Sequence, residues 1–74
     1  MMTITKDMII AEVLNMDRGT IPIFFRNGLQ CLGCAMASGE TIEEACAIHG
    51  LDCDLLIEEL NRFFESKEES QAHS

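Results

Sequence analysis

Apolar residues recur at three- and four-residue spacing in several short stretches of the chain, a pattern typical of amphipathic helices. The first stretch, residues 8–16, predicts a helix whose apolar face consists of Ile9, Ile10, Val13 and Leu14. The alternating residues 3–5 that precede it predict a short extended lead-in. The chain is therefore expected to begin with an extended segment and a two-turn helix.

A second helix is predicted from Thr20 to Gly28. Threonine commonly caps helix N-termini, Pro22 fits the first turn, and glycine is a common stop after the last turn. The expected inward face consists of Ile21, Phe24 and Phe25. A third, one-turn helix is predicted over residues 34–38, where good helix formers lead to a glycine at position 39.

The second half of the chain carries the clearest helix signals. Thr41 and Glu44 match a capping box, which predicts a helix from Ile42 to His49 that Gly50 closes. Asp52 then caps a last helix that is expected to end at about Glu65, with an apolar face of Leu55, Leu56, Leu60, Phe63 and Phe64. Residues 66–74 lack an apolar period and predict a polar, disordered tail.

No stretch alternates long enough to predict a sheet, and the links between the predicted helices are short. Short links force neighbouring helices to pack against one another. The sequence therefore predicts an all-α fold, a compact orthogonal bundle of about five short helices. A single domain is expected over residues 1–65, followed by the tail over residues 66–74.

Length and charge narrow the classes of protein that remain. At 74 residues the chain is one small domain, which excludes a two-domain enzyme. Thirteen acidic residues against five basic ones give a net charge of -8, so we expect neither nucleic acid nor a membrane as a partner.

The N-terminus lacks the pattern of a signal peptide, which predicts a cytoplasmic location. Four cysteines in a reducing compartment favour redox chemistry or metal binding over structural disulfides.

The spacing Cys31-Leu32-Gly33-Cys34 brings two sulfurs within disulfide reach, with Gly33 allowing the tight turn. A disulfide that closes a ring this small stabilises the fold by only about 2 kcal/mol through the lost entropy of the unfolded chain, so a purely structural role is not favoured. Cys34 stands in the first turn of a predicted helix, where unpaired amides favour a thiolate. We predict a reversible dithiol, with Cys31 as the attacking and Cys34 as the resolving sulfur, and no cofactor.

A metal site is the alternative use of these cysteines. Cys31, Cys34, Cys46 and His49 read as C-x2-C-x11-C-x2-H, a spacing compatible with zinc or an iron–sulfur cluster. The simpler interpretation makes Cys46 a small buried hydrophobe and His49 a residue that caps helix carbonyls. Cys53 is expected to be a half-buried spectator, with a third redox thiol as its alternative.

A non-catalytic interaction domain is a third hypothesis. A domain of this size cannot bury every aromatic face, so a homodimer through exposed phenylalanines is compatible with the sequence. The chain has no serine, histidine and acid constellation and no phosphate-binding loop. Thiol–disulfide oxidoreductase activity is therefore the one enzymatic activity left open.

Several segments taken together resemble a known family. They are NGLQCLGC at 27–34, GETIEEAC at 39–46, HGLD at 49–52 and ITKDM at 4–8. This combination resembles the hybrid-cluster-protein-associated redox-disulfide domain, a family otherwise catalogued as of unknown function. The resemblance covers about residues 3–64. One departure is Ile9, where a threonine or serine cap is expected for the first helix.

The resemblance implies a small helical domain of bacteria, often anaerobes, with a redox pair carried here by Cys31 and Cys34. It also implies a partner protein reached by thiol–disulfide exchange, such as a hybrid-cluster or iron–sulfur protein. The chain is similar in addition to the N-terminal domain of iron–sulfur cluster repair di-iron proteins, which place cysteines before a comparable helix. That second likeness keeps cluster-related chemistry open.

Overall fold

The computed structural model describes residues 3–31, 33 and 37–72, with residues 68–72 described by their backbone alone. In this part of the chain the α-helices are α1 (Ile10–Met16), α2 (Ile21–Arg26), α4 (Ile42–His49) and α5 (Cys53–Ala72), and a 3-10 turn, η1 (Arg18–Thr20), joins α1 to α2. No strand occurs among these residues, so the predicted all-α fold is confirmed.

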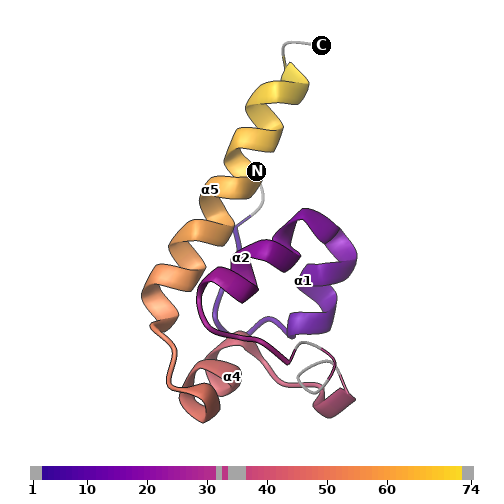
Figure 1. Ribbon diagram of the computed structural model, residues 1–74. Coiled ribbons are helices and arrows are strands. Elements are labelled where there is room, and N and C mark those ends of the chain that lie inside the picture. The colour runs from indigo at the N-terminus through magenta and orange to yellow at the C-terminus, as the bar shows by residue number, and fades with distance from the viewer. Residues whose placement is uncertain (1–2, 32, 34–36, 73–74) are drawn as a thin grey trace.

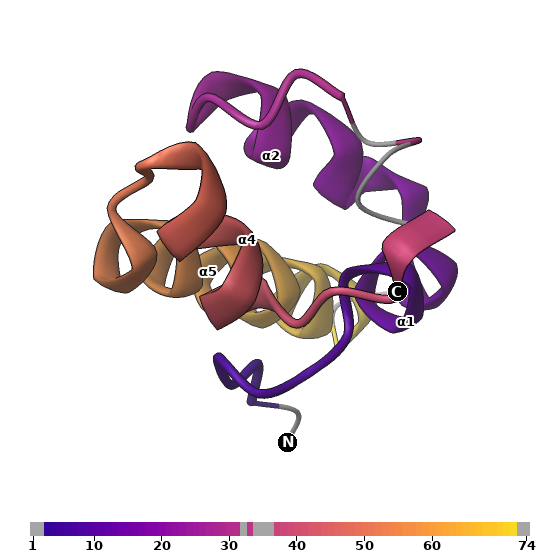
Figure 2. The same ribbon diagram turned by 90° about the horizontal axis from the view of Figure 1, so that it is seen from below.

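Helix α5 forms one side of the molecule and projects beyond the other helices (Figure 1). Helices α2 and α4 both pack against α5, with α4 at the lower end of the molecule in Figure 1 and in front of α5 in the view from below (Figure 2). The projecting end of α5 accounts for the elongated outline, 39 Å long and about half as wide in the other two directions, 21 and 20 Å.

A single hydrophobic core lies between the helices and includes residues from all of them. Its buried members are Ile4, Ile10, Val13, Leu14, Ile23, Phe24, Leu29, Ile42, Ala45, Cys46, Leu56, Leu60 and Phe64. Burying one such large side chain stabilises a fold by about 1.5–3 kcal/mol. Helices of six to eight residues, such as α2 and α4, are too short to be stable alone, so the shared core holds them together.

The N-terminal segment is part of the bundle because it is pinned to the middle of α5. Ile4 is buried, and its N–H donates to Asn61 Oδ1 at 2.6 Å. The Asn61 amide in turn donates to the carbonyl of Ile4 at 3.1 Å. One side chain therefore satisfies both backbone polar groups of a buried residue that belongs to no helix.

The start of α4 is satisfied by the same N-terminal segment. The first two amides of the helix, on Ile42 and Glu43, donate to the carbonyls of Met8 and Lys6, each at 2.9 Å. The third amide uses the predicted capping box, in which Glu44 N–H donates to Thr41 Oγ1 at 3.1 Å and Thr41 N–H donates to Glu44 Oε1 at 2.9 Å. Every amide of the first turn thus has a partner within the chain.

Helices α1 and α2 begin within two residues of the predicted positions, but the predicted caps are not both formed. Helix α2 begins after Thr20, but the Thr20 hydroxyl does not cap it. Thr20 is fully buried, and its hydroxyl donates to the carbonyl of Asp17 at 2.8 Å, while Asp17 Oδ1 accepts from Gly19 N–H at 2.7 Å and caps η1. Helix α1 begins at Ile10, and no side-chain hydrogen bond from Ile9 caps it.

Two further predictions are corrected. Phe25 was expected on the inward face of its helix but is 47% exposed, because the short α2 buries Ile23 and Phe24 instead. The last helix was expected to end at about Glu65, yet α5 continues to Ala72. Once packed turns have nucleated a helix, further residues extend it at little cost, and an apolar face is not required. Of the predicted one-turn helix, Ala37 and Ser38 are helical and residues 34–36 lie outside the described residues.

We expect Asn61→Ala to lower the free energy of unfolding by about 1–3 kcal/mol, because it leaves two buried backbone groups of Ile4 without partners. Urea unfolding followed by circular dichroism measures this, since the chain has no tryptophan or tyrosine to report by fluorescence.

Arg62→Ala is the matched control for Asn61→Ala. Its side chain is exposed on the same helix and forms a surface ion pair with Glu58 one turn earlier, so its loss is expected to cost about 0.5 kcal/mol or less. Equal losses in the two variants would contradict the proposed role of Asn61.

Candidate functional site

The segment that carries Cys31 is held at both ends. At its start Gly28 adopts a left-handed backbone with φ 100°, and Leu29, which is fully buried, donates to the carbonyl of Phe24 at 3.0 Å. At its end the Glu40 carbonyl accepts from Ile10 N–H at 3.0 Å, and Thr41 forms an isolated antiparallel bridge with Ile9. The fold therefore fixes where the segment leaves and re-enters the core.

Between these anchors every residue that the structure describes is exposed, namely Gln30, Cys31, Gly33, Ala37, Ser38 and Gly39. Cys31 is disulfide-bonded. Cys34, its predicted partner, lies outside the described residues, so the pairing and the roles of the two sulfurs stay predictions. The exposure of Cys31 means that this sulfur lies where another protein can reach it.

The two remaining cysteines lie together at the junction of α4 and α5. Both are free thiols; Cys46 is 4% exposed and Cys53 is half-buried. Burial raises the pKa of the Cys46 thiol to about 12, and its hydrogen bond with Cys53 adds to this rise. The prediction of Cys46 as a buried small hydrophobe is therefore met, but the contact with Cys53 was not foreseen.

The metal alternative requires Cys31, Cys46 and His49 to approach one another. Within the described ranges no group of three histidine, cysteine or acidic side chains is placed to hold a metal ion, and these three residues form no such group. His49 is exposed in the last turn of α4. Cys34, the fourth member, is not among the described residues, so metal binding stays a prediction.

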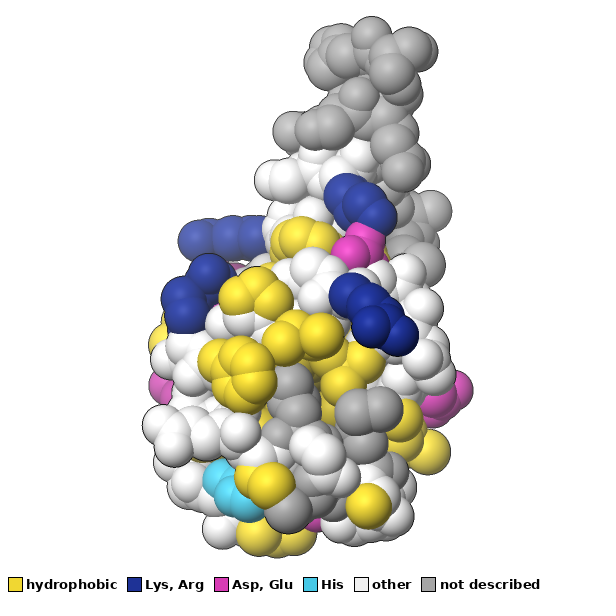
Figure 3. Space-filling view, turned by 45° about the vertical axis from the view of Figure 1, so that its right-hand side comes forward, with side chains coloured by type: hydrophobic (Ala, Val, Ile, Leu, Met, Phe, Trp, Pro, Cys, Tyr) yellow, Lys and Arg dark blue, Asp and Glu magenta, His cyan; other side chains and the backbone are white. Residues whose placement is uncertain are grey.

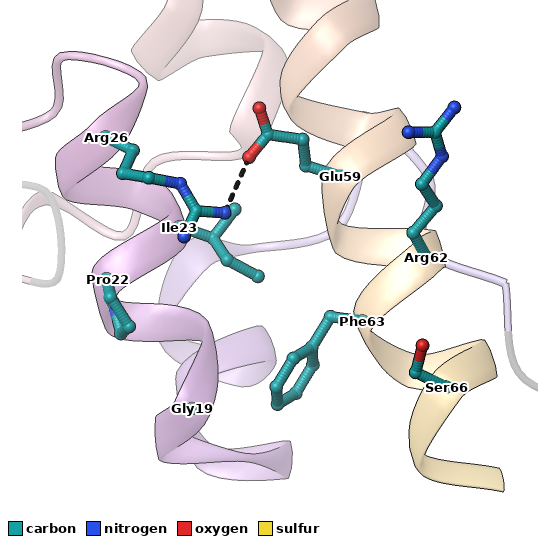
Figure 4. Close-up of a pocket in the computed structure, with 8 residues that line it drawn as sticks. All are labelled: Gly19, Pro22, Ile23, Arg26, Glu59, Arg62, Phe63 and Ser66. Carbon is teal, nitrogen blue, oxygen red and sulfur yellow. Dashed lines mark hydrogen bonds and ion pairs between the residues drawn. The ribbon is translucent and has the colours of Figure 1, made fainter. Parts of the chain in front are cut away.

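Sequence reasoning also missed a groove between α2 and α5, which Figure 4 shows in close-up. It encloses about 610 Å³ and is lined by Gly19, Pro22, Ile23, Arg26, Glu59, Arg62, Phe63 and Ser66. Gly19 lets the backbone approach Phe63 closely, because a Cβ atom would lie 2.5 Å from Cζ of that ring and would force it to shift. The separate helix patterns of the two walls carry no signal that could have located this groove.

Charges in the groove are paired within the chain. Arg26 lies 3.0 Å from Glu59 Oε2, and this contact, together with a hydrogen bond from Asn27, lowers the pKa of the Glu59 carboxyl. Arg62 pairs with Glu58 at 2.6 Å. Both arginines are thus neutralised, and what the groove offers a ligand is chiefly its apolar wall.

Hydrophobic side chains gather on one face of the molecule, with lysine and arginine side chains beside them (Figure 3). Of the four phenylalanines, Phe24 and Phe64 are buried and Phe63 is half-buried, so Phe25 is the aromatic available to a second protein chain. No helix in the described part of the chain has the length and apolarity that a membrane span requires.

The described residues thus form a small all-α domain with an exposed segment that carries Cys31. The chain belongs to the family described as Domain of unknown function (DUF1858), whose model matches residues 4–57. It is 66% identical to a protein from Clostridium thermocellum whose solution structure was determined by NMR as a structural genomics target. That likeness covers 90% of this chain and 96% of the other, with a TM-score of 0.83. None of the curated proteins matches.

The raised pKa of Cys46 predicts a pH dependence of stability. Above pH 9.0 the unfolded chain loses this proton, whereas the folded chain keeps it until about pH 12. The folded state then binds more protons, so the free energy of unfolding falls as the pH rises through this window. We expect the slope to exceed that of Cys46→Ala by at most about 1.4 kcal/mol per pH unit.

Urea unfolding of both proteins across the window, with a reductant present, measures the two slopes. The alanine variant keeps a small apolar side chain in the core and removes the titrating group. Identical slopes would contradict a buried neutral thiol at this position.

Proposed function

We propose that the protein is a thiol–disulfide redox module that exchanges electrons with a partner protein through Cys31 and Cys34. The observation that carries this proposal is the exposed, disulfide-bonded Cys31 on a segment whose described residues are all exposed. Thiol–disulfide exchange requires the sulfur of one protein to meet the sulfur of another, so access decides which cysteines take part.

In the reduced form the Cys31 thiolate attacks a disulfide of the partner, which forms a mixed disulfide and releases one partner thiolate. The Cys34 thiolate then attacks the Cys31 sulfur, which closes the internal disulfide and releases the second partner thiolate. Two electrons pass to the partner, and the two protons that the module's thiols give up are taken up by the partner's two thiolates. The reverse sequence oxidises the partner and reduces the module.

The anchors described above support this chemistry. Attack by one sulfur on another requires an aligned approach, and a segment whose ends are fixed to the core presents its sulfur in a restricted set of positions. The buried Leu29 and the bridge between Ile9 and Thr41 supply that restriction. The apolar side chain of Phe25, at the end of α2, is exposed for contact with a docked protein.

The resemblance to the hybrid-cluster-associated domain supports a partner of a particular class. We propose a protein that carries a hybrid or other iron–sulfur cluster, met in a reducing cytoplasm. Under that assignment the pair needs no cofactor of its own, because the sulfurs carry both electrons.

A redox titration against the glutathione couple tests the function. We expect the Cys31–Cys34 pair to pass reversibly between dithiol and disulfide within about -150 to -330 mV. Cleavage after Arg26 and Glu40 isolates a peptide that contains these two cysteines and neither of the others. Alkylation followed by mass spectrometry of that peptide therefore counts the relevant thiols alone.

Cys53→Ser is the matched control, because it leaves the CxGC pair intact and should titrate like the wild type. Cys31→Ser should abolish the transition, and Cys34→Ser should trap a partner on Cys31 as a stable mixed disulfide. A pair that never changes state in this window would rule out the redox function. Stoichiometric zinc or iron in protein prepared without chelator would instead favour the metal alternative.

A further inference from the structure

Two free thiols lie side by side where α4 ends and α5 begins, away from the segment that carries Cys31. Cys46 is in the last two turns of α4, and Cys53 is the first residue of α5. The two side chains interact with one another, and Cys46 belongs to the core while Cys53 packs against it. Proximity of two thiols is the first requirement for a disulfide between them.

The turn between the helices keeps the thiols together. Gly50 adopts a left-handed backbone with φ 68°, and the next amide, Leu51 N–H, donates to the carbonyl of Cys46 at 2.9 Å. Asp52 Oδ1 accepts from Leu55 N–H at 3.2 Å and caps α5. Each cysteine is therefore fixed at a helix end that has its own hydrogen-bonded cap, with three residues between the two helices.

The two sulfurs differ in access. Cys46 is 4% exposed, whereas Cys53 is half-buried and open to a small reagent. Lys6, which pairs with Glu43 at 3.2 Å, also lies within electrostatic range of Cys53. Glu43 neutralises this lysine and Asp54 lies in the same range, so access and not charge separates the two sulfurs, since the core keeps a small reagent from Cys46.

We propose that Cys46 and Cys53 form a second redox pair, which closes into a disulfide across the α4–α5 turn on exposure to a small disulfide such as glutathione disulfide. This pair is independent of the proposed function of Cys31 and Cys34. Its oxidation joins the short α4 covalently to the long α5, and α4 is the helix whose start is bonded to the N-terminal segment.

The reaction balances in two exchanges. The Cys53 thiolate attacks glutathione disulfide, which forms a mixed disulfide on Cys53 and releases one glutathione thiolate. The Cys46 thiol then loses its proton and attacks the Cys53 sulfur, which forms the protein disulfide and releases the second glutathione thiolate. Two protein thiols are oxidised, one glutathione disulfide is reduced to two glutathiones, and the proton count is conserved when both leave as thiols.

The second exchange is expected to be the slow one. The Cys46 thiol is neutral at ordinary pH because burial disfavours its charged form, and a neutral thiol is a poor nucleophile. Cys53 should therefore carry glutathione transiently before the disulfide closes. A glutathione adduct that persists on Cys53 before the disulfide closes is therefore the expected sign of this slow second step.

Peptide mapping of the full-length protein tests the proposal. Reduced wild-type protein is incubated with glutathione disulfide, alkylated at intervals, and cleaved after Glu44 and Asp52. These cuts place Cys46 in peptide 45–52 and Cys53 in a separate peptide, so only a disulfide can keep them together. We expect the linked species, lighter by two hydrogens than the sum of its parts, to rise from none to the major form.

Two alanine variants define the order. In Cys46→Ala, Cys53 should accumulate as a stable mixed disulfide with glutathione. In Cys53→Ala, Cys46 should remain an alkylatable thiol over the same time, because the core shields it. Circular dichroism checks that both variants are folded. The mapping of the wild-type protein tests the disulfide even if a variant does not fold.

Three outcomes would overturn the proposal. They are wild-type protein in which both thiols stay alkylatable, a glutathione adduct on Cys53 that never resolves, and Cys46 oxidised in Cys53→Ala as fast as in the wild type. Since Cys31 and Cys34 fall in a different peptide, the mapping reports the oxidation of each pair separately. A negative result for Cys46 and Cys53 therefore does not bear on the proposed function of Cys31 and Cys34.

Discussion

The backbone hydrogen bonds between the N-terminal segment and the first turn of α4 are the constraint on which the rest of the structure depends. They join residues 6–8 to residues 42–43, which are far apart in the sequence and do not belong to one helix. Ile42 is fully buried, and its amide, left without a partner, would be destabilising by about 1–3 kcal/mol. Here the lead-in segment supplies the carbonyls, and Asn61 pins that segment to α5.

This constraint also determines what the cysteine segment can do. Because Thr41 is held by both the capping box and the bridge to Ile9, the chain re-enters the core at a defined place. The described residues between the anchors are all exposed, so they add little to the hydrophobic core. The cysteines divide accordingly. Cys31 lies outside on the segment, whereas Cys46 lies in the core beside Cys53.

Local signals were sufficient for the helix that follows Thr41. A capping box and a terminal glycine act over four or fewer residues, so their outcome does not depend on distant contacts. Phe25 was misplaced because the period of a six-residue helix leaves two adjacent phenylalanines as candidates for the inward face. The position of α5 selects Phe24. Thr20 was misplaced for a related reason, since its burial leaves its hydroxyl only the Asp17 carbonyl as a partner.

The sequence by itself determined the helical class, most helix starts and stops, and the CxGC spacing of Cys31 and Cys34, because each of these follows from residues within one or two turns. Only the tertiary structure decided that a groove opens between α2 and α5 and that Cys46 contacts Cys53. Cys46 and Cys53 are seven residues apart, and the distance between their sulfurs is not defined until the turn between α4 and α5 has formed. The physical reason is that the periodicity of a sequence determines which residues share one face of a helix, whereas contacts between helices depend on the angle and distance at which their axes cross.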